Sequence, residues 1–120
     1  MDLAQAITAL ASAIALAEGY TQRGSLPWRA CNPGDLEEGD LGNGTLNSKT
    51  IYPDHSSGWA ALEFQCGRIL TGSSTHYKPT MTVPQIAAIY TGNDNPAGWA
   101  ATVCDALGLL PTDPLSKILS

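Results

Sequence analysis

Basic residues are scarce in this chain of 120 residues. Six lysines and arginines stand against eleven aspartates and glutamates, and the formal net charge is −5. The six basic residues are also scattered along the sequence, so they form no cluster. Nucleic acids and anionic membrane surfaces are bound through basic faces. The composition therefore argues against nucleic-acid binding and against a polybasic membrane contact.

Cysteine is equally sparse, and the three cysteines are Cys31, Cys66 and Cys104. This number excludes a dense disulfide framework, and no C-x-x-C spacing indicates a zinc site. Cys66 and Cys104 each fall within an expected helix, where they can form one disulfide or remain reduced thiols. Cysteine usage therefore leaves the redox compartment open.

Long hydrophobic runs are also missing. The most apolar stretch, residues 3–17, is shorter than the ~20 residues that a membrane-spanning helix needs. No lysine or arginine precedes it, although a signal peptide begins with a basic region. We therefore expect no membrane insertion and no signal peptide, and we interpret residues 3–17 as a core helix.

The residues that are present predict one globular domain covering positions 1–120, because 43% of the chain is hydrophobic. The first segment repeats apolar residues at the spacing of one helical face, and Gly19 is expected to end that helix. The members of this apolar stripe are Leu3, Ile7, Leu10, Ala11 and Ile14.

Further helices are indicated by their capping residues. The expected caps and stops are Ser56 or Ser57 with Gly72, Thr82 and Gln85 with Pro84 in the first turn, Asn95 and Pro96 with Gly108, and Asp113 with Pro114. Between the first helix and these, residues 32–54 have no helical period, and Asn43-Gly44 is a strong hairpin-turn signal. The sequence predicts an α+β, mostly α domain with a small β-hairpin insertion after the first helix.

Glu18 stands at the end of the apolar first segment, one turn beyond Ile14 and close to the stripe expected to face the core. Burial and the negative end of the helix dipole both disfavour its ionised form and raise its pKa. A carboxyl group that stays protonated near neutral pH can serve as a general acid. On helix position alone, a solvated glutamate or one paired with Arg23 or Arg29 is the alternative.

Four motifs follow one another at a defined spacing: "AEGY" (17–20), "CNPGDL" (31–36), "GWAALEF" (58–64) and "TVPQIAAIYTGNDNPAGW" (82–99). In this order they resemble the lysozyme-like superfamily, and most of all the phage and bacterial lytic-transglycosylase-type (muramidase) domains. The resemblance spans residues 7–110. It implies a lysozyme-like fold and an enzyme that cleaves the MurNAc–GlcNAc β-1,4 bond of peptidoglycan without a cofactor or metal.

The resemblance also implies roles for particular residues. Glu18 matches the catalytic general acid and base, and Asn32 matches the loop that lines the cleft opposite it. Tyr90 matches a tyrosine that hydrogen-bonds the glutamate or the substrate, and Asn93 matches the Asn-Asp pair that follows. Asn32, Tyr90 and Asn93 are therefore expected to bind the substrate beside Glu18.

Two positions depart from the family pattern, and two aromatic residues add further candidates. Cys31 stands where an asparagine is usual, and Trp99 stands where a tyrosine is common. Tyr20 and Trp28 lie in the loop beside Glu18 and are candidates for stacking on a sugar. Trp99, like Trp59, begins a helix among alanines and is expected in the core.

The acidic loop after Asn32 decides which reaction the resemblance implies. Asp35 and Glu38 are the candidates for a second carboxylate, which would support hydrolysis by holding a water or by forming a covalent intermediate. Without a second carboxylate, Glu18 acting as a base would deprotonate the sugar's 6-hydroxyl and give an anhydro product. A solvated hairpin face is the alternative interpretation of these charges.

The implied partner is a peptidoglycan glycan strand, bound by a monomer that acts at the cell wall as a periplasmic, secreted or virion-associated protein. The acidic net charge and Cys31 leave a second interpretation open. In that interpretation the chain is a non-catalytic, lysozyme-like glycan-binding or structural module of a phage particle or secretion apparatus. His55 and His76 lie in separate expected loops, so neither is expected to bind a metal.

Overall fold

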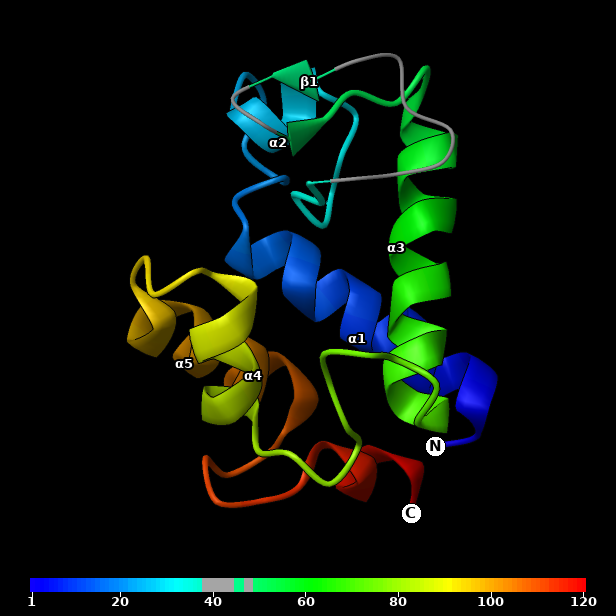
Figure 1. The fold of residues 1–120 in the computed structure, drawn as a ribbon, viewed down its shortest axis with the longest axis vertical. Helices are drawn as coiled ribbons and strands as arrows, with labels where there is room; N and C mark the ends of the chain where they lie inside the picture. Colours follow the sequence, from blue (N-terminus) through cyan, green and yellow to red (C-terminus); the bar gives the residue numbers. More distant parts are fainter. Residues whose placement is uncertain (38–44, 47–48) are drawn as a thin grey trace.

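The computed structural model of the chain describes residues 1–37, 45–46 and 49–120. Within these ranges the chain is a small, mostly helical α+β domain (Figure 1), which confirms the expected class. No helix in this part of the chain is long and apolar enough to cross a membrane. The elements are α1 (Leu3–Ala17), α2 (Leu26–Arg29), β1 (Thr45–Leu46), β2 (Lys49–Thr50), α3 (His55–Thr71), α4 (Val83–Tyr90), α5 (Pro96–Leu107) and the 3₁₀ helix η1 (Leu115–Leu119).

Helix α1 packs against both α3 and α5 and forms the centre of the core. Its buried residues are mostly alanines, with Leu10 and Ile14 as the larger side chains. Small side chains on this face allow the neighbouring helices to approach closely. Leu3 was expected on the same stripe but is 42% exposed, because the first turn of α1 lies at the edge of the molecule.

Helix boundaries follow the capping residues where these are strongest. Thr82 and Gln85 form the expected capping box at the start of α4, and the side chain of Asn95 caps α5. Gly72 and Gly108 end α3 and α5 with φ of 82° and 67°, a left-handed conformation that glycine adopts without strain. These expectations are confirmed.

Two helix expectations are wrong in detail. Helix α3 begins at His55 because the Asp54 carboxylate, rather than a serine, accepts the Ser57 N–H at 2.7 Å. The C-terminal segment is the 3₁₀ helix η1 and has no side-chain cap. Asp113 instead accepts the backbone N–H of Leu110 at 2.8 Å, so its carboxylate closes the preceding turn.

Strands β1 and β2 form an antiparallel pair, so a small hairpin follows the first helix as expected. The pairing comes after Asn43-Gly44 rather than around it, and Asn43-Gly44 lies outside the described residues, as do positions 47–48. The paired residues are Thr45 with Thr50 and Leu46 with Lys49.

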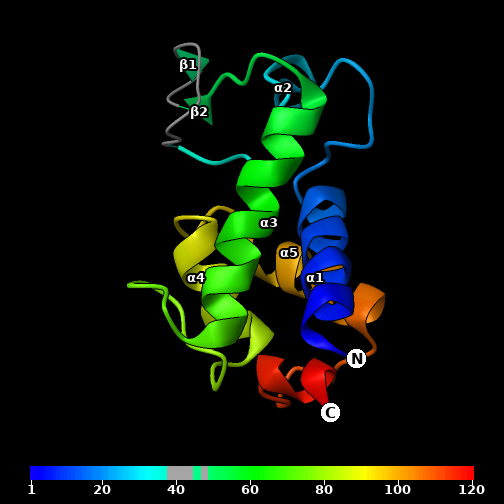
Figure 2. The same cartoon turned by 90° about the vertical axis from the view of Figure 1, so that its right-hand side faces the viewer.

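The sequence does not predict helix α2, because four residues are too few to show a helical period. Its signals are local: the Ser25 hydroxyl accepts the Trp28 N–H at 3.3 Å, and Pro27 occupies the first turn. Helix α2, the strand pair and the N-terminal end of α3 lie together at one end of the molecule (Figure 2). Helices α4, α5 and η1 lie towards the other end.

All three cysteines are free thiols, with Cys66 and Cys104 buried and Cys31 half-buried. The structure thus shows the reduced alternative rather than a Cys66–Cys104 disulfide. Burial raises the pKa of Cys66 to about 12, so this thiol stays protonated near neutral pH.

Candidate active site

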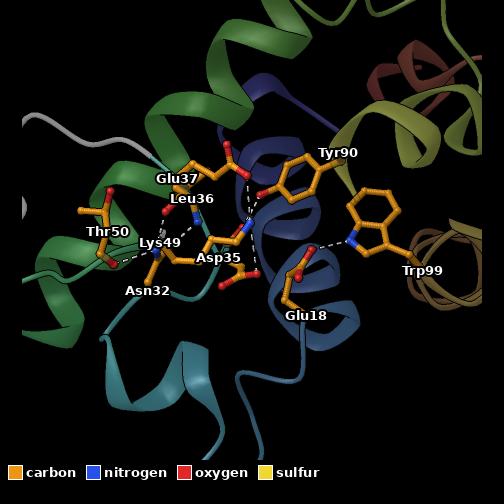
Figure 3. Close-up of polar contacts among 10 residues, drawn as sticks. Glu18, Asn32, Asp35, Leu36, Glu37, Lys49, Thr50, Tyr90 and Trp99 are labelled. Carbon is orange, nitrogen blue, oxygen red and sulfur yellow. Dashed lines mark hydrogen bonds and ion pairs between the residues drawn. The ribbon is translucent and has the colours of Figure 1, made fainter. Parts of the chain in front are cut away.

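A cleft of about 590 Å³ opens between the end of α1, the loop after α2, strand β2 and helices α4 and α5. Among residues 1–37, 45–46 and 49–120, its lining contains three carboxylates, one lysine and two aromatic rings. These residues are Glu18, Asp35, Asp94, Lys49, Tyr90 and Trp99. The cleft therefore brings together residues that are far apart in the sequence, and most of them are shown in Figure 3.

Glu18 is the C-cap of α1, and its backbone N–H still donates to Ile14 at 2.9 Å. Gly19 follows with φ of 80° and turns the chain away from the helix axis. The half-buried Glu18 side chain points into the cleft, where its Oε2 atom accepts a hydrogen bond from Trp99 Nε1 at 2.8 Å (Figure 3). The end of α1 thus places the Glu18 carboxyl in the cleft, with one of its two oxygens fixed by the hydrogen bond from Trp99.

Burial raises the pKa of Glu18 from 4.5 to about 7. The hydrogen bond from Trp99 opposes this rise, since it favours the charged form, and Lys49 opposes it as well. The negative charges of Asp35 and Asp94 raise the pKa further. Near neutral pH a large fraction of the molecules therefore carries a protonated Glu18, and the direction of the pKa shift is the one expected from burial.

An aromatic row forms the wall behind Glu18 and explains its burial. Tyr77, Tyr90 and Trp99 follow one another, with ring centroids 6.0 Å apart for the first pair and 5.0 Å apart for the second. Tyr77 and Trp99 are buried, at 7% and 5% exposure. The rings are tilted against one another, by 36° and 32°. Tyr90 and Trp99 line the cleft together with Glu18, and their packed rings contribute to the burial that raises the pKa of Glu18.

Tyr90 lines the cleft, but its hydroxyl does not hydrogen-bond Glu18. It donates instead to the carbonyl of Gly34 at 2.6 Å and so ties the loop after α2 to helix α4. The hydrogen bond to Glu18 comes from Trp99, which sequence analysis placed in the core. A buried tryptophan needs an acceptor for its N–H, and this requirement was the available signal.

Asn32 is fully buried, so the expectation that its side chain contacts a ligand is wrong for this conformation. Its Nδ2 donates to the carbonyls of Leu36 and Thr50 at 2.8 and 2.9 Å, and its Oδ1 accepts the Leu36 N–H at 2.9 Å. These bonds join the loop to strand β2 (Figure 3). Asn32 therefore positions the cleft wall without lining the cleft.

Asp35 is the second carboxylate that the described loop brings into the cleft with Glu18. Its Oδ2 lies 3.6 Å from Lys49 Nζ, which also lies 3.4 Å from Glu37 Oε1. Burial raises the pKa of Asp35, while the Lys49 ammonium lowers it. Glu38, the other candidate for a second carboxylate, lies outside the described residues.

Tyr20 does not belong to the cleft lining, which corrects the expectation that it contacts a sugar. It is 6% exposed, and its hydroxyl is 2.6 Å from Nδ1 of His55. Its ring packs against Trp28 and Trp59, with centroids 5.7 and 5.5 Å away. The turn at Gly19 therefore directs Tyr20 into an aromatic cluster beside α2 and α3, and Trp28 belongs to the same cluster.

Asn93 is exposed, has φ of 68° and is not part of the cleft lining. Asparagine tolerates this left-handed conformation better than most residues, so its place is explained by the turn between α4 and α5. The following residues, Asp94 and Asn95, line the cleft instead. Of the expected Asn93-Asp94 pair, Asp94 lines the cleft and Asn93 does not.

Sequence reasoning also missed Lys49, the cation that faces Asp35 across the loop. Nothing near Lys49 in the sequence marks it, because its position depends on how strand β2 pairs with the loop.

No protein-family model matches the chain, and no curated protein and no solved structure is significantly similar to it.

Proposed function

We propose that this protein cleaves the MurNAc–GlcNAc β-1,4 bond of peptidoglycan, with Glu18 as general acid and base on a lysozyme-like fold. One observation carries the proposal: the carboxyl group of Glu18, with a pKa of about 7, opens into a cleft of about 590 Å³. A buried acid that is half-protonated near neutral pH is costly for the fold and suited to proton transfer. The order of the sequence motifs supports the same reaction.

The lining of the cleft suits a polysaccharide. Asp94, Asn95 and Thr102 offer carboxylate, amide and hydroxyl groups, which pair with sugar hydroxyls and acetamido groups. The rings of Tyr90 and Trp99 form the apolar part of the wall. A few polar groups placed around an aromatic surface are typical of sites that orient a ligand.

The reaction begins with protonated Glu18 next to the glycosidic oxygen. Glu18 gives its proton to this oxygen, the bond from the anomeric carbon to the oxygen breaks, and the electron pair leaves with the departing sugar alcohol. The remaining sugar carries oxocarbenium character, which the carboxylate of Asp35 stabilises. Glu18, now ionised, takes a proton from water or from the sugar's own 6-hydroxyl as either oxygen attacks the anomeric carbon.

Mass spectrometry of purified peptidoglycan incubated with the protein tests this proposal. We expect soluble muropeptides whose glycan ends are either reducing or anhydro. Reducing ends would assign water as the nucleophile, and anhydro ends would assign the 6-hydroxyl. Retention on the glycan with no product after long incubation would overturn the proposal and support the glycan-binding module.

The pH dependence of cleavage follows from the raised pKa of Glu18. The acid form is present below about 7 and is lost as the pH rises through this value. We therefore expect kcat/KM to fall about tenfold for each pH unit above this point. A rate profile on a soluble glycan fragment measures it, with circular dichroism at each pH to confirm that the fold persists. A rate that stays constant up to pH 9 would contradict the role of Glu18.

A further inference from the structure

The two oxygens of the Glu18 carboxyl have different surroundings. Oε2 accepts the hydrogen bond from Trp99 Nε1 at 2.8 Å. Oε1 has no hydrogen-bond partner among residues 1–37, 45–46 and 49–120, and it is not a buried polar atom. Since Glu18 lines the cleft, Oε1 is the oxygen that is available to a bound molecule.

The indole of Trp99 restricts where the proton of Glu18 can reside. An indole N–H donates a hydrogen bond but cannot accept one. In a neutral carboxyl the carbonyl oxygen is a better acceptor than the hydroxyl oxygen, so the oxygen that accepts from Trp99, Oε2, is the one without the proton. The neutral carboxyl therefore carries its proton on Oε1.

Trp99 is also held in place well enough to fix this arrangement. It is 5% exposed, and its ring packs against Tyr90 at a tilt of 32°, with centroids 5.0 Å apart. It lies in the first turn of α5, whose start is fixed by the cap at Asn95. A donor anchored by a helix terminus and by a ring contact keeps the carboxyl plane in one orientation.

We infer that Trp99 is a positioning residue that keeps the acidic proton of Glu18 on Oε1 and thereby directs it into the cleft. The inference rests on the proposed function, since proton delivery matters only if a glycan is cleaved there. It adds a specific residue and a specific oxygen atom to that function. It also explains why a buried tryptophan turns its one polar atom towards the cleft.

The same contact serves the second half of the reaction. When Oε1 has given its proton to the leaving oxygen, the Trp99 N–H donates to a charged carboxylate, and such hydrogen bonds are stronger than neutral ones. Oε1 then faces the cleft without a proton and can take one from water or from the 6-hydroxyl. One oxygen atom of Glu18 thus both gives and receives the proton.

The test removes the N–H and keeps an aromatic ring. In the Trp99→Phe variant we expect the titration midpoint of Glu18 to rise above about 7, because the hydrogen bond that favours its charged form is lost. NMR with ¹³C-labelled glutamate reads this midpoint directly, since the chain has only four glutamates, Glu18, Glu37, Glu38 and Glu63. We also expect kcat to fall about ten- to a hundredfold with little change in KM, because the acid is misoriented.

Two further variants separate positioning from packing. Trp28→Phe makes the same change in the aromatic cluster outside the cleft, and we expect it to leave the Glu18 midpoint unchanged. Replacing Trp99 by 3-benzothienylalanine keeps the two-ring shape and puts sulfur in place of the N–H. If Trp99→Phe does not fold, this analogue provides the same comparison with the ring volume preserved.

The outcomes distinguish the inference from the proposed function. An unchanged Glu18 midpoint in both Trp99 variants would overturn the inference even if the wild-type protein cleaves peptidoglycan. A raised midpoint with a lowered kcat supports it. A raised midpoint in a protein that cleaves no glycan would overturn the proposed function and the delivery of the proton, and would leave only the contact itself.

Discussion

Replacing Glu18 by glutamine is expected to abolish glycan cleavage and, at pH 8, to stabilise the fold. Glutamine cannot donate the acidic proton, yet its side-chain oxygen can still accept from Trp99 Nε1. In the wild-type protein the pKa of Glu18 is raised from 4.5 to about 7, so the unfolded chain releases this proton first as the pH rises. Stability therefore falls between these two values, and the full difference corresponds to about 3 kcal/mol.

Urea unfolding at pH 4 and pH 8, together with a cleavage assay, measures both effects. The free energy of unfolding of Glu18→Gln should exceed that of the wild type by about 3 kcal/mol at pH 8, and the two should agree at pH 4. Glu63→Gln changes an exposed glutamate on α3 and serves as the matched control. Retained cleavage in Glu18→Gln would exclude the catalytic role, and equal stability at pH 8 would exclude a buried, proton-holding carboxyl.

This expected gain in stability bears on the choice between an enzyme and a binding module. A glycan-binding site needs hydrogen-bond partners for sugar hydroxyls, and a glutamine at position 18 would supply them at lower cost to the fold. A carboxyl group whose pKa is raised, so that it stays protonated near neutral pH, is useful when a proton must be transferred. Local sacrifice of stability at one residue is typical of catalytic sites.

The sequence predicts most of the helices because their signals are local. Capping residues such as Thr82 and Asn95, and stops such as Gly72, act within one turn of the helix end, so they are visible in the sequence. Helix α2 and the strands β1 and β2 are too short to repeat a helical or strand pattern, so the cap at Ser25 and the turn signal at Asn43-Gly44 do not fix where these elements lie. Their positions are set by contacts with the rest of the fold.

In the candidate site, too, features with local signals could be predicted from the sequence, and contacts between distant residues could not. Glu18 was accessible to sequence reasoning because it ends an apolar helix and because the motifs that follow it stand in the order of the family it resembles. Its contact with Trp99 joins residues 81 positions apart, and the bond from Tyr90 to Gly34 joins residues 56 apart. Spacing cannot reveal such pairs. Asn32 was correctly placed in the important loop, but its role as a buried support depends on strand β2, which the sequence did not position.

Asn32 supports the cleft wall, so Asn32→Ala is expected to destabilise the protein and to reduce cleavage. The change removes the three hydrogen bonds to Leu36 and Thr50. The Leu36 carbonyl keeps the Thr50 N–H as a donor, while the Leu36 N–H and the Thr50 carbonyl lose the bonds that Asn32 makes. Buried groups left unsatisfied cost ~1–3 kcal/mol each, of which relaxation and water recover a part. We expect the free energy of unfolding to fall by about 2–4 kcal/mol in a urea titration.

The loss of cleavage in Asn32→Ala should result from displacement of the loop that carries Asp35, and not from a change in Glu18 itself. Asn32 holds the segment that carries Asp35 to the strand that carries Lys49, so its loss should lower kcat. The Glu18 titration midpoint should move little, because Asp35 raises the pKa of Glu18 and Lys49 lowers it, and the two effects offset each other. Asn93→Gly is the matched stability control, because Asn93 is exposed at φ of 68°, where glycine is accepted without strain. Its free energy of unfolding should stay within about 0.5 kcal/mol of the wild type. If Asn32→Ala were equally neutral, the buried hydrogen bonds of Asn32 would not hold the loop, and the placement of Asp35 opposite Glu18 would need another cause.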